Sequence, residues 1–348
     1  MITVSKLNIQ ELLDRATLAA DARWAGASVS DLDPLPGGIS SLTFAARLSW
    51  PRDEARRIVL KVAPPGLPPV RNRDVLRQAR VLQALHPIDG VSVPEVLFED
   101  GCDPPFFGMD FVAGQAYEPY KDVSPNPPVP EVVGDRARAA ARMLGRLQLI
   151  VPDEVGLGTE PVIPLATELE RWTRLYATAG DDLRQHETEL ADRLAASVPS
   201  PAAPRILHGD FRLGNMQFDG AHLGAIIDWE IWSVGDPRTD LAWLLTYTDP
   251  VQRFQAERDE PNRVAMEAMP SREELLSEYL ETGPADPGDL NWFLAYCLYK
   301  IASTTSVLAK QNRRRPTPDP ALEFAASTIP AVLSRGLETL ALSQPVAP

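Results

Sequence analysis

The stretch "RILHGDFRLGNMQFDGAHLGAIIDWEIWSVGDPRTDLAWLL", Arg205 to Leu245, decides how this chain is interpreted. It holds a histidine, several acids and an asparagine between apolar runs, which a folding core alone does not require. "RILHGDF" places an apolar strand end before Asp210, and Asn215 follows in the same loop. "MQFD" and "LGAIID" are typical of a short hairpin that delivers Asp228 at the end of a second apolar strand. Polar side chains at two strand ends mark a candidate site.

Two acids and one amide on such loops are the residue types that phosphoryl transfer requires, because the protein contributes mainly positioning and charge neutralisation. Asp210 is the candidate carboxylate for orienting the attacking hydroxyl and accepting its proton. Asp228 and Asn215 offer the oxygen ligands that Mg²⁺ prefers. Taken singly, each residue is more typical of a turn or a strand-end cap. The ordered set of three favours catalysis.

Composition excludes several other classes of protein. The chain has 348 residues, enough for one large domain or two lobes, and its 34 basic and 48 acidic residues give a net charge of −14. This balance argues against nucleic-acid binding, which needs clustered cations. Cys102 and Cys297 are the only cysteines and there are four histidines, so a disulfide framework and a zinc site are not expected. Without an apolar leader or a membrane-length apolar run, we expect a cytoplasmic protein with no membrane partner.

The two halves of the chain differ in pattern. An opening helix over residues 8–24 precedes segments of strand character, among them "RRIVLKVAPP", "VPEVLFED" and "PPFFGMDFVAG", with one internal helix in "RNRDVLRQARVLQAL". From about residue 127 the pattern changes to long amphipathic helices. We therefore predict an α+β fold with a β-rich lobe over residues 1–112 and a larger α-helical lobe over residues 113–348.

These motifs resemble the aminoglycoside-phosphotransferase-like kinases, which share the two-lobed protein-kinase-like fold. "HGDFRLGN", "IIDWE" and "GDPRTDLAWLL" are most similar to the branch associated with acyl-CoA dehydrogenases. "LPGGISSLTFAARL" resembles the glycine-bearing nucleotide loop, "IVLKVAP" the lysine strand and "FFGMDFVAG" the hinge. The resemblance runs from about residue 30 to about residue 335, and the central motifs are its most specific part.

The resemblance implies a role for each matching residue. Asp210 would be the catalytic base, Asn215 and Asp228 would bind Mg²⁺, and Lys61 would pair with the phosphates of ATP. His208 and Asp240 would brace the catalytic loop. The remaining nucleotide contacts would come from Gly37, Gly38, Ser40 and Ser41 over the phosphates and from the main chain of Met109, Asp110 and Phe111 at the adenine.

Two residues depart from the family pattern, and a third fits two interpretations. The internal helix carries Gln78 where the family usually has a glutamate paired with the lysine, so the charge of that anchor is missing. Gln148 stands where the family often has histidine, with a small packing effect expected. Arg212 fits two interpretations equally, a charge-neutralising group for the transferred phosphoryl and a surface ion pair.

The leading hypothesis is therefore a kinase that uses ATP and Mg²⁺ to phosphorylate a hydroxyl of a small molecule, either aminoglycoside-type or a hydroxyacyl or other metabolite. The alternative is a nucleotide-binding module that has lost catalysis. A protein kinase is disfavoured because no "APE"-type segment follows Asp228. Four aromatic residues of the late helices are candidates for an acceptor pocket, although their helical spacing is more typical of a core: Tyr279, Trp292, Tyr296 and Tyr299. Oligomeric state cannot be inferred.

Overall fold

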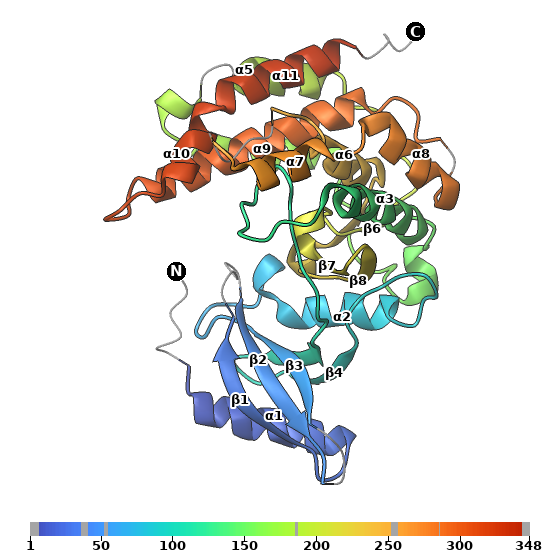
Figure 1. The fold of residues 1–348 in the computed structure, drawn as a ribbon, viewed down its shortest axis with the longest axis vertical. Coiled ribbons are helices and arrows are strands. Elements are labelled where there is room, and N and C mark those ends of the chain that lie inside the picture. The colour runs from blue at the N-terminus through green and yellow to red at the C-terminus, as the bar shows by residue number, and fades with distance from the viewer. Residues whose placement is uncertain are drawn as a thin grey trace.

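A computed structural model describes residues 7–35, 41–51, 55–184, 187–251, 257–284 and 286–342 of the chain. Figure 1 shows a small sheet-containing lobe at the N-terminal end and a larger helical lobe at the C-terminal end. This arrangement confirms the predicted α+β, two-lobed, kinase-like fold class. Among the described residues, no helix is both long and apolar enough to span a membrane.

The N-terminal lobe is an antiparallel five-stranded sheet in the order β1-β2-β3-β5-β4, with α1 on one face and α2 on the other. Its elements are α1 (Ile9–Arg23), β1 (Ser28–Pro34), β2 (Leu42–Ser49), β3 (Arg56–Val62), α2 (Val75–Leu85), β4 (Val96–Asp100) and β5 (Phe106–Asp110).

Alternation along β3 decides what each face of the sheet presents. Ile58 and Leu60 join the apolar cluster under α1, whereas Val59 belongs to the cluster under α2. Because successive side chains of a strand point to opposite faces, Lys61 lies on the α2 side with Val59. The lysine is thereby directed away from α1 and toward the junction of the lobes.

The C-terminal lobe is built around α9, whose length is buried against α4, α6, α10 and α11. Its helices are α3 (Pro130–Leu147), α4 (Leu165–Tyr176), α5 (Glu187–Ala196), α6 (Arg238–Thr246), α7 (Glu260–Glu267), α8 (Arg272–Thr282), α9 (Asn291–Asn312), α10 (Pro320–Ser327) and α11 (Ile329–Ala341). A capping box of Ser271 and Glu274 is present at the start of α8.

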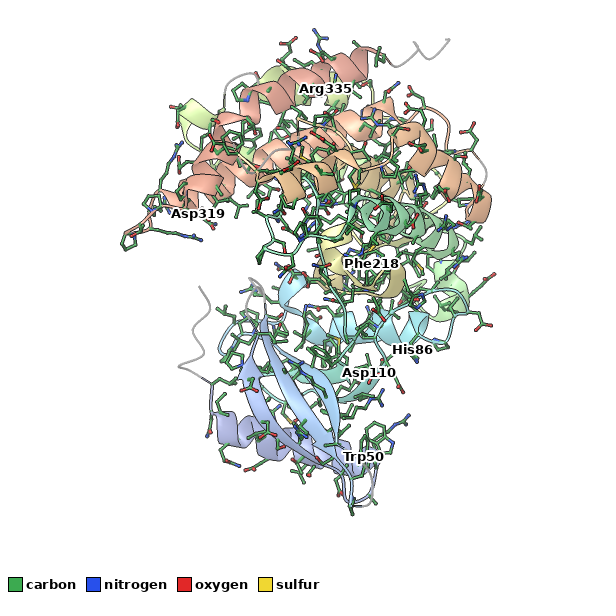
Figure 2. All side chains as sticks on the ribbon, in the orientation of Figure 1. Trp50, His86, Asp110, Phe218, Asp319 and Arg335 are labelled. Carbon is green, nitrogen blue, oxygen red and sulfur yellow. The ribbon has the colours of Figure 1, made fainter. Side chains whose placement is uncertain are left out.

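Two small antiparallel strand pairs lie within the stretch from Arg205 to Leu245. β6 (Arg205–Leu207) pairs with β9 (Ser233–Gly235), and β7 (Met216–Asp219) forms the predicted hairpin with β8 (His222–Ile226). One segment, between β5 and α3, connects the lobes; in Figure 2 Asp110 and Phe218 lie on the two sides of this junction. The main apolar core includes residues of both lobes, so the lobes share one packed interior.

Candidate active site

Lys61 and Asp228 form an ion pair across the junction of the lobes. The Lys61 Nζ lies 2.7 Å from Asp228 Oδ1 and 3.3 Å from the amide oxygen of Gln78 on α2. Lys61 is buried, and the same three residues line a narrow cavity with Met109 and Trp229. Gln78 therefore stands where the sequence placed it, as a neutral hydrogen-bond partner of the lysine.

The backbone of Asp228 adopts the left-handed conformation, with φ of 64°. This region is uncommon for residues other than glycine and costs free energy unless the surroundings enforce it. Trp229 and Trp232 enforce it here, since both are fully buried and the Trp229 Nε1 donates to the Ile226 carbonyl at 3.1 Å. The Asp228 side chain remains 43% exposed, so its carboxylate is open to a ligand.

The loop before Asp210 is held by Asp240 from the first turn of α6. Its two carboxylate oxygens accept the main-chain N–H groups of His208 at 2.6 Å and Gly209 at 3.0 Å. The His208 Nε2 lies 2.8 Å from the Ile227 carbonyl, and its Nδ1 accepts the Asp210 N–H at 3.2 Å. His208 thus ties the Asp210 loop to the residue before Asp228, and both of its ring nitrogens are occupied.

Gly209 is required at this position by both conformation and space. Its φ is +84°, and a Cβ would lie 2.8 Å from the Ile231 carbonyl oxygen. Any other residue would strain the loop or displace the segment after Asp228.

Three side chains donate to the Asp210 carboxylate. They are Asn215 Nδ2 at 2.7 Å, Trp243 Nε1 at 2.8 Å and Arg212 Nε at 3.1 Å. Burial by itself would raise the pKa of Asp210, but the charges of Arg212 and Lys300 outweigh it and hold the pKa below its ordinary value. Asp210 is therefore a fixed, ionised carboxylate at neutral pH.

The groups that could hold Mg²⁺ lie on two adjoining chain segments. The Ile227 N–H donates to the Asn215 carbonyl at 2.9 Å, so Asp228 follows directly after a residue bonded to Asn215. The amide nitrogen of Asn215 donates twice to Asp210, which leaves the amide oxygen as the ligand atom. One carboxylate and one amide oxygen fit a hard cation that completes its shell with water and phosphate. No group of three or more His, Cys, Asp or Glu side chains in the described part of the chain could hold a metal by itself.

Of the four residues predicted to cover the phosphates, only Ser41 lies within the described part of the chain. Gly37, Gly38 and Ser40 lie outside the described residues. Ser41 is buried, and its hydroxyl has no hydrogen-bond partner among the residues described.

The main chain that is expected to contact adenine at the hinge lies at the end of β5. Met109 is paired within the sheet to both neighbouring strands, and the Asp110 N–H donates to the Glu95 carbonyl at 3.0 Å. Because β5 continues to Asp110, the Asp110 N–H serves the sheet. Met109 instead contributes its side chain to the cavity wall. Contact of adenine with the main chain of Met109, Asp110 and Phe111 stays a prediction.

Arg212 is engaged with acids of the protein. Its Nε faces both oxygens of Asp210, at 3.2 and 3.1 Å, and one terminal nitrogen lies 3.9 Å from Glu118. Arg212 therefore forms an ion pair, as one of the two interpretations has it, but the pair with Asp210 lies inside the site and not on the surface. Contact with a phosphoryl group stays a prediction.

Sequence analysis missed three residues that act on the catalytic loop: Trp243, Lys300 and Glu118. The Lys300 Nζ donates to the Gly209 carbonyl at 2.8 Å and lies 4.1 Å from the centre of the Trp243 ring. A lone lysine within the apolar run "WFLAYCLYKIA" was a signal that could have identified it. Glu118, in the ordinary-looking "AYEPYKD", gives no such signal.

The four late aromatic residues are buried in the core, in agreement with their helical spacing, and a role in an acceptor pocket stays a prediction. Trp292 and Tyr296 stack at 5.4 Å, and the Tyr279 hydroxyl donates to the Gln148 amide oxygen at 2.6 Å. Gln148 also donates to the Pro237 carbonyl at 2.8 Å, which fixes the start of α6. That helix begins at Arg238, and the carboxylate of Asp236 accepts the Arg238 N–H at 3.1 Å.

A two-lobed fold with a lysine strand and an acid–amide–acid set at the lobe junction defines a kinase-like phosphotransferase. Residues 31–274 match the profile of the phosphotransferase enzyme family. The chain belongs to this family of phosphoryl-transferring enzymes.

Relatives of the chain fall into two groups. It is 26% identical to acyl-CoA dehydrogenase family member 10 of Mus musculus over 79% of its length and 28% identical to the probable acyl-CoA dehydrogenase IBR3 of Arabidopsis thaliana over 71%. It spans only 26% and 32% of those proteins. Viomycin phosphotransferase of Streptomyces vinaceus is 31% identical over 47% of this chain and 60% of its own length.

Among solved structures, a putative aminoglycoside phosphotransferase from Ralstonia eutropha superposes with a TM-score of 0.74 at 20% identity, covering 97% of this chain and 99% of that one. The aminoglycoside phosphotransferase APH(4)-Ia in complex with ADP and hygromycin B has a TM-score of 0.55 at 13% identity, with 94% and 97% covered. At these identities the likeness establishes the fold.

Proposed function

We propose that this protein is a kinase that uses ATP and Mg²⁺ to transfer the γ-phosphoryl group to a hydroxyl of a small molecule. The observation that carries the proposal is the Asp210 carboxylate, ionised and fixed by three donors, next to the segments that present Asn215 and Asp228. Positioning and electrostatics are the main protein contributions to this reaction, and these residues supply both.

Each residue has a part in the proposed reaction. The acceptor hydroxyl would donate its hydrogen bond to Asp210, its oxygen would form a bond to the γ-phosphorus, and the proton would pass to the carboxylate as the bond to ADP breaks. Lys61 would exchange Asp228 for phosphate oxygens as its partner. His208 and Asp240 would hold the loop without reacting.

Mg²⁺, when bound, neutralises phosphate charge during transfer. Asn215 and Asp228 would hold it, because the Asn215 amide oxygen accepts no hydrogen bond from the described residues and Asp228 offers a half-exposed carboxylate. Use of ATP is supported by the like-folded phosphotransferase that was solved with ADP and with AMP-PNP.

The acceptor is proposed only as a class. Viomycin phosphotransferase and the hygromycin-bound neighbour favour an aminoglycoside-type alcohol, whereas the dehydrogenase-associated relatives favour a hydroxyacyl compound or another hydroxylated metabolite. The cytoplasmic location and the absence of nucleic-acid and membrane partners stay predictions.

A screen for ADP release over a panel of hydroxyl compounds tests the proposal. Wild type and Asp210→Asn would be compared at equal Mg²⁺ and ATP, with nucleotide affinity measured for both. Turnover by wild type alone supports the kinase. Equal turnover on every compound would favour the alternative, a catalytically inactive nucleotide-binding module.

A further inference from the structure

Glu118 lies in the segment that connects the lobes, between β5 and α3, and is fully buried. A tight turn fixes its backbone, since the Glu118 N–H donates to Asp122 Oδ2 at 2.7 Å and the Glu118 carbonyl accepts the Asp122 N–H at 2.8 Å. Just before the turn, Gln115 exchanges two main-chain hydrogen bonds with Phe218 of β7. The connecting segment is thus attached to the catalytic half of the chain at this point.

The Glu118 side chain points into the loop that follows Asp210. Its Oε2 accepts the Gly214 N–H at 3.2 Å and lies 3.9 Å from a terminal nitrogen of Arg212. Gly214 makes this approach feasible, because a Cβ there would lie 2.0 Å from the same Arg212 nitrogen and 3.3 Å from the Glu118 Cβ. Arg212 therefore lies over a glycine, with Glu118 at one end and Asp210 at the other.

Folding alone does not account for this carboxylate. Burying a charge is costly unless it is paired and hydrogen-bonded. Glu118 has one backbone donor and one cation that is not in hydrogen-bond contact, and its Oε1 is buried without a partner among the described residues. Because this costly buried carboxylate lies next to the Asp210–Arg212 pair, we infer that Glu118 has a role in the site.

We propose that Glu118 is a positioning residue for phosphoryl transfer, which orients Arg212 and through it the carboxylate of Asp210. This inference deepens the proposed kinase function and rests on it. Glu118 does not touch the reacting atoms. Through Glu118, the orientation of the Asp210 carboxylate depends on the segment that joins the lobes.

The protonation state of Glu118 should then affect the rate. Burial raises the pKa of Glu118 to about 7, against the lowering effects of Arg212 and the Gly214 N–H. Only the ionised form attracts Arg212, so kcat should be higher at pH 8 than at pH 6. The charged or titratable groups around Glu118 are Arg212, Lys121, Asp122, Tyr117 and Tyr247. Burial raises the pKa of both tyrosines, which keeps them neutral over this range.

Glu118→Gln tests the proposal, because the amide can still accept the Gly214 N–H but carries no charge for Arg212. We expect kcat at pH 8 to fall about tenfold, the KM for ATP to stay within about twofold, and the rise of kcat between pH 6 and 8 to vanish. Asp249→Asn is the matched control. Asp249 is also a buried carboxylate, and its partner is Arg335 on α11, whose Nε lies 2.9 Å from Asp249 Oδ2. Because this pair is not part of the site, Asp249→Asn should leave kcat and its pH profile unchanged.

Two further measurements separate positioning from general damage. In an Arg212→Gln background, Glu118→Gln should produce no additional loss of kcat, because it acts through the arginine. By NMR, the Arg212 Nε–H that donates to Asp210 should exchange with water several-fold faster in Glu118→Gln than in wild type. This signal is identified by its loss in Arg212→Gln.

Additive losses in the double variant, or unchanged exchange of the Arg212 Nε–H, would overturn the proposal. The exchange measurement needs no turnover, so it decides the role of Glu118 even if wild type phosphorylates no compound. That latter result would count against the proposed kinase function instead.

Discussion

The ammonium group of Lys61 lies 2.7 Å from a carboxylate oxygen of Asp228, so a strand of the N-terminal sheet is paired directly with the loop after the β7–β8 hairpin. The two residues come from opposite lobes and meet at the narrow cavity lined also by Gln78 and Met109. In the proposed reaction this pair must open, since Lys61 is to meet phosphate and Asp228 is to meet Mg²⁺.

Asp228→Asn should weaken binding of ATP together with Mg²⁺ by at least about tenfold, because a neutral amide replaces the charged metal ligand. Binding of ATP with EDTA present should change far less. Titration calorimetry with and without Mg²⁺ measures both. An equal loss under the two conditions would show that Asp228 serves the structure and not the metal.

Gln78→Glu should increase the affinity for ATP and Mg²⁺ about threefold to tenfold. A charged partner for Lys61 is worth roughly 1 kcal/mol more than a neutral one, and it would release Asp228 for the metal. Initial-rate kinetics give the KM for ATP, and Gln83→Glu, on the same helix but directed away from Lys61, is the control. A KM that rises or stays constant contradicts the expected competition.

Lys300→Met should move the acidic limit of activity to higher pH. Arg212 and Lys300 together hold the pKa of Asp210 below its ordinary value despite burial. In wild type, kcat should therefore not decline through protonation of Asp210 until the pH falls below the ordinary pKa of an aspartate. Removing the Lys300 charge raises this pKa, so the decline should begin at higher pH, as a pH–rate profile between pH 4 and 8 would reveal. If the pH–rate profiles of wild type and Lys300→Met coincide on the acidic side, Lys300 has no electrostatic effect on Asp210.

Asp240→Asn should lower the free energy of unfolding by about 1–3 kcal/mol. An asparagine oxygen can accept only one of the two N–H groups, from His208 and Gly209, that the fully buried carboxylate now accepts. Urea unfolding measures the change, with the exposed Asp135→Asn on α3 as the control. Loss of stability no larger than in the control would mean that the loop is held by other contacts.

The fold could be predicted because its signals are local. The hairpin after Asn215 and the strand around Lys61 each depend on neighbours in sequence. The central site residues could be identified for the same reason, since Asp210 and Asp228 each follow an apolar strand in the sequence. Their roles stay predictions.

Other parts of the site depend on contacts that sequence spacing does not record. Glu118 reaches Gly214 across 96 positions, and Lys300 reaches Gly209 across 91. Nothing in "AYEPYKD" distinguishes a buried carboxylate from a solvated one. The end of β5 at Asp110 is likewise set by pairing with strands that are distant in sequence.

The most direct measurement of the central claim is a single-turnover transfer of γ-³²P from ATP to an acceptor alcohol found in the screen. Wild type and Asp210→Asn would be compared, each saturated with ATP and Mg²⁺. We expect labelled product from wild type and a loss of at least about a hundredfold in the variant, with nucleotide affinity preserved. Equal label transfer by both proteins would contradict the assignment of Asp210, and with it this account of the site.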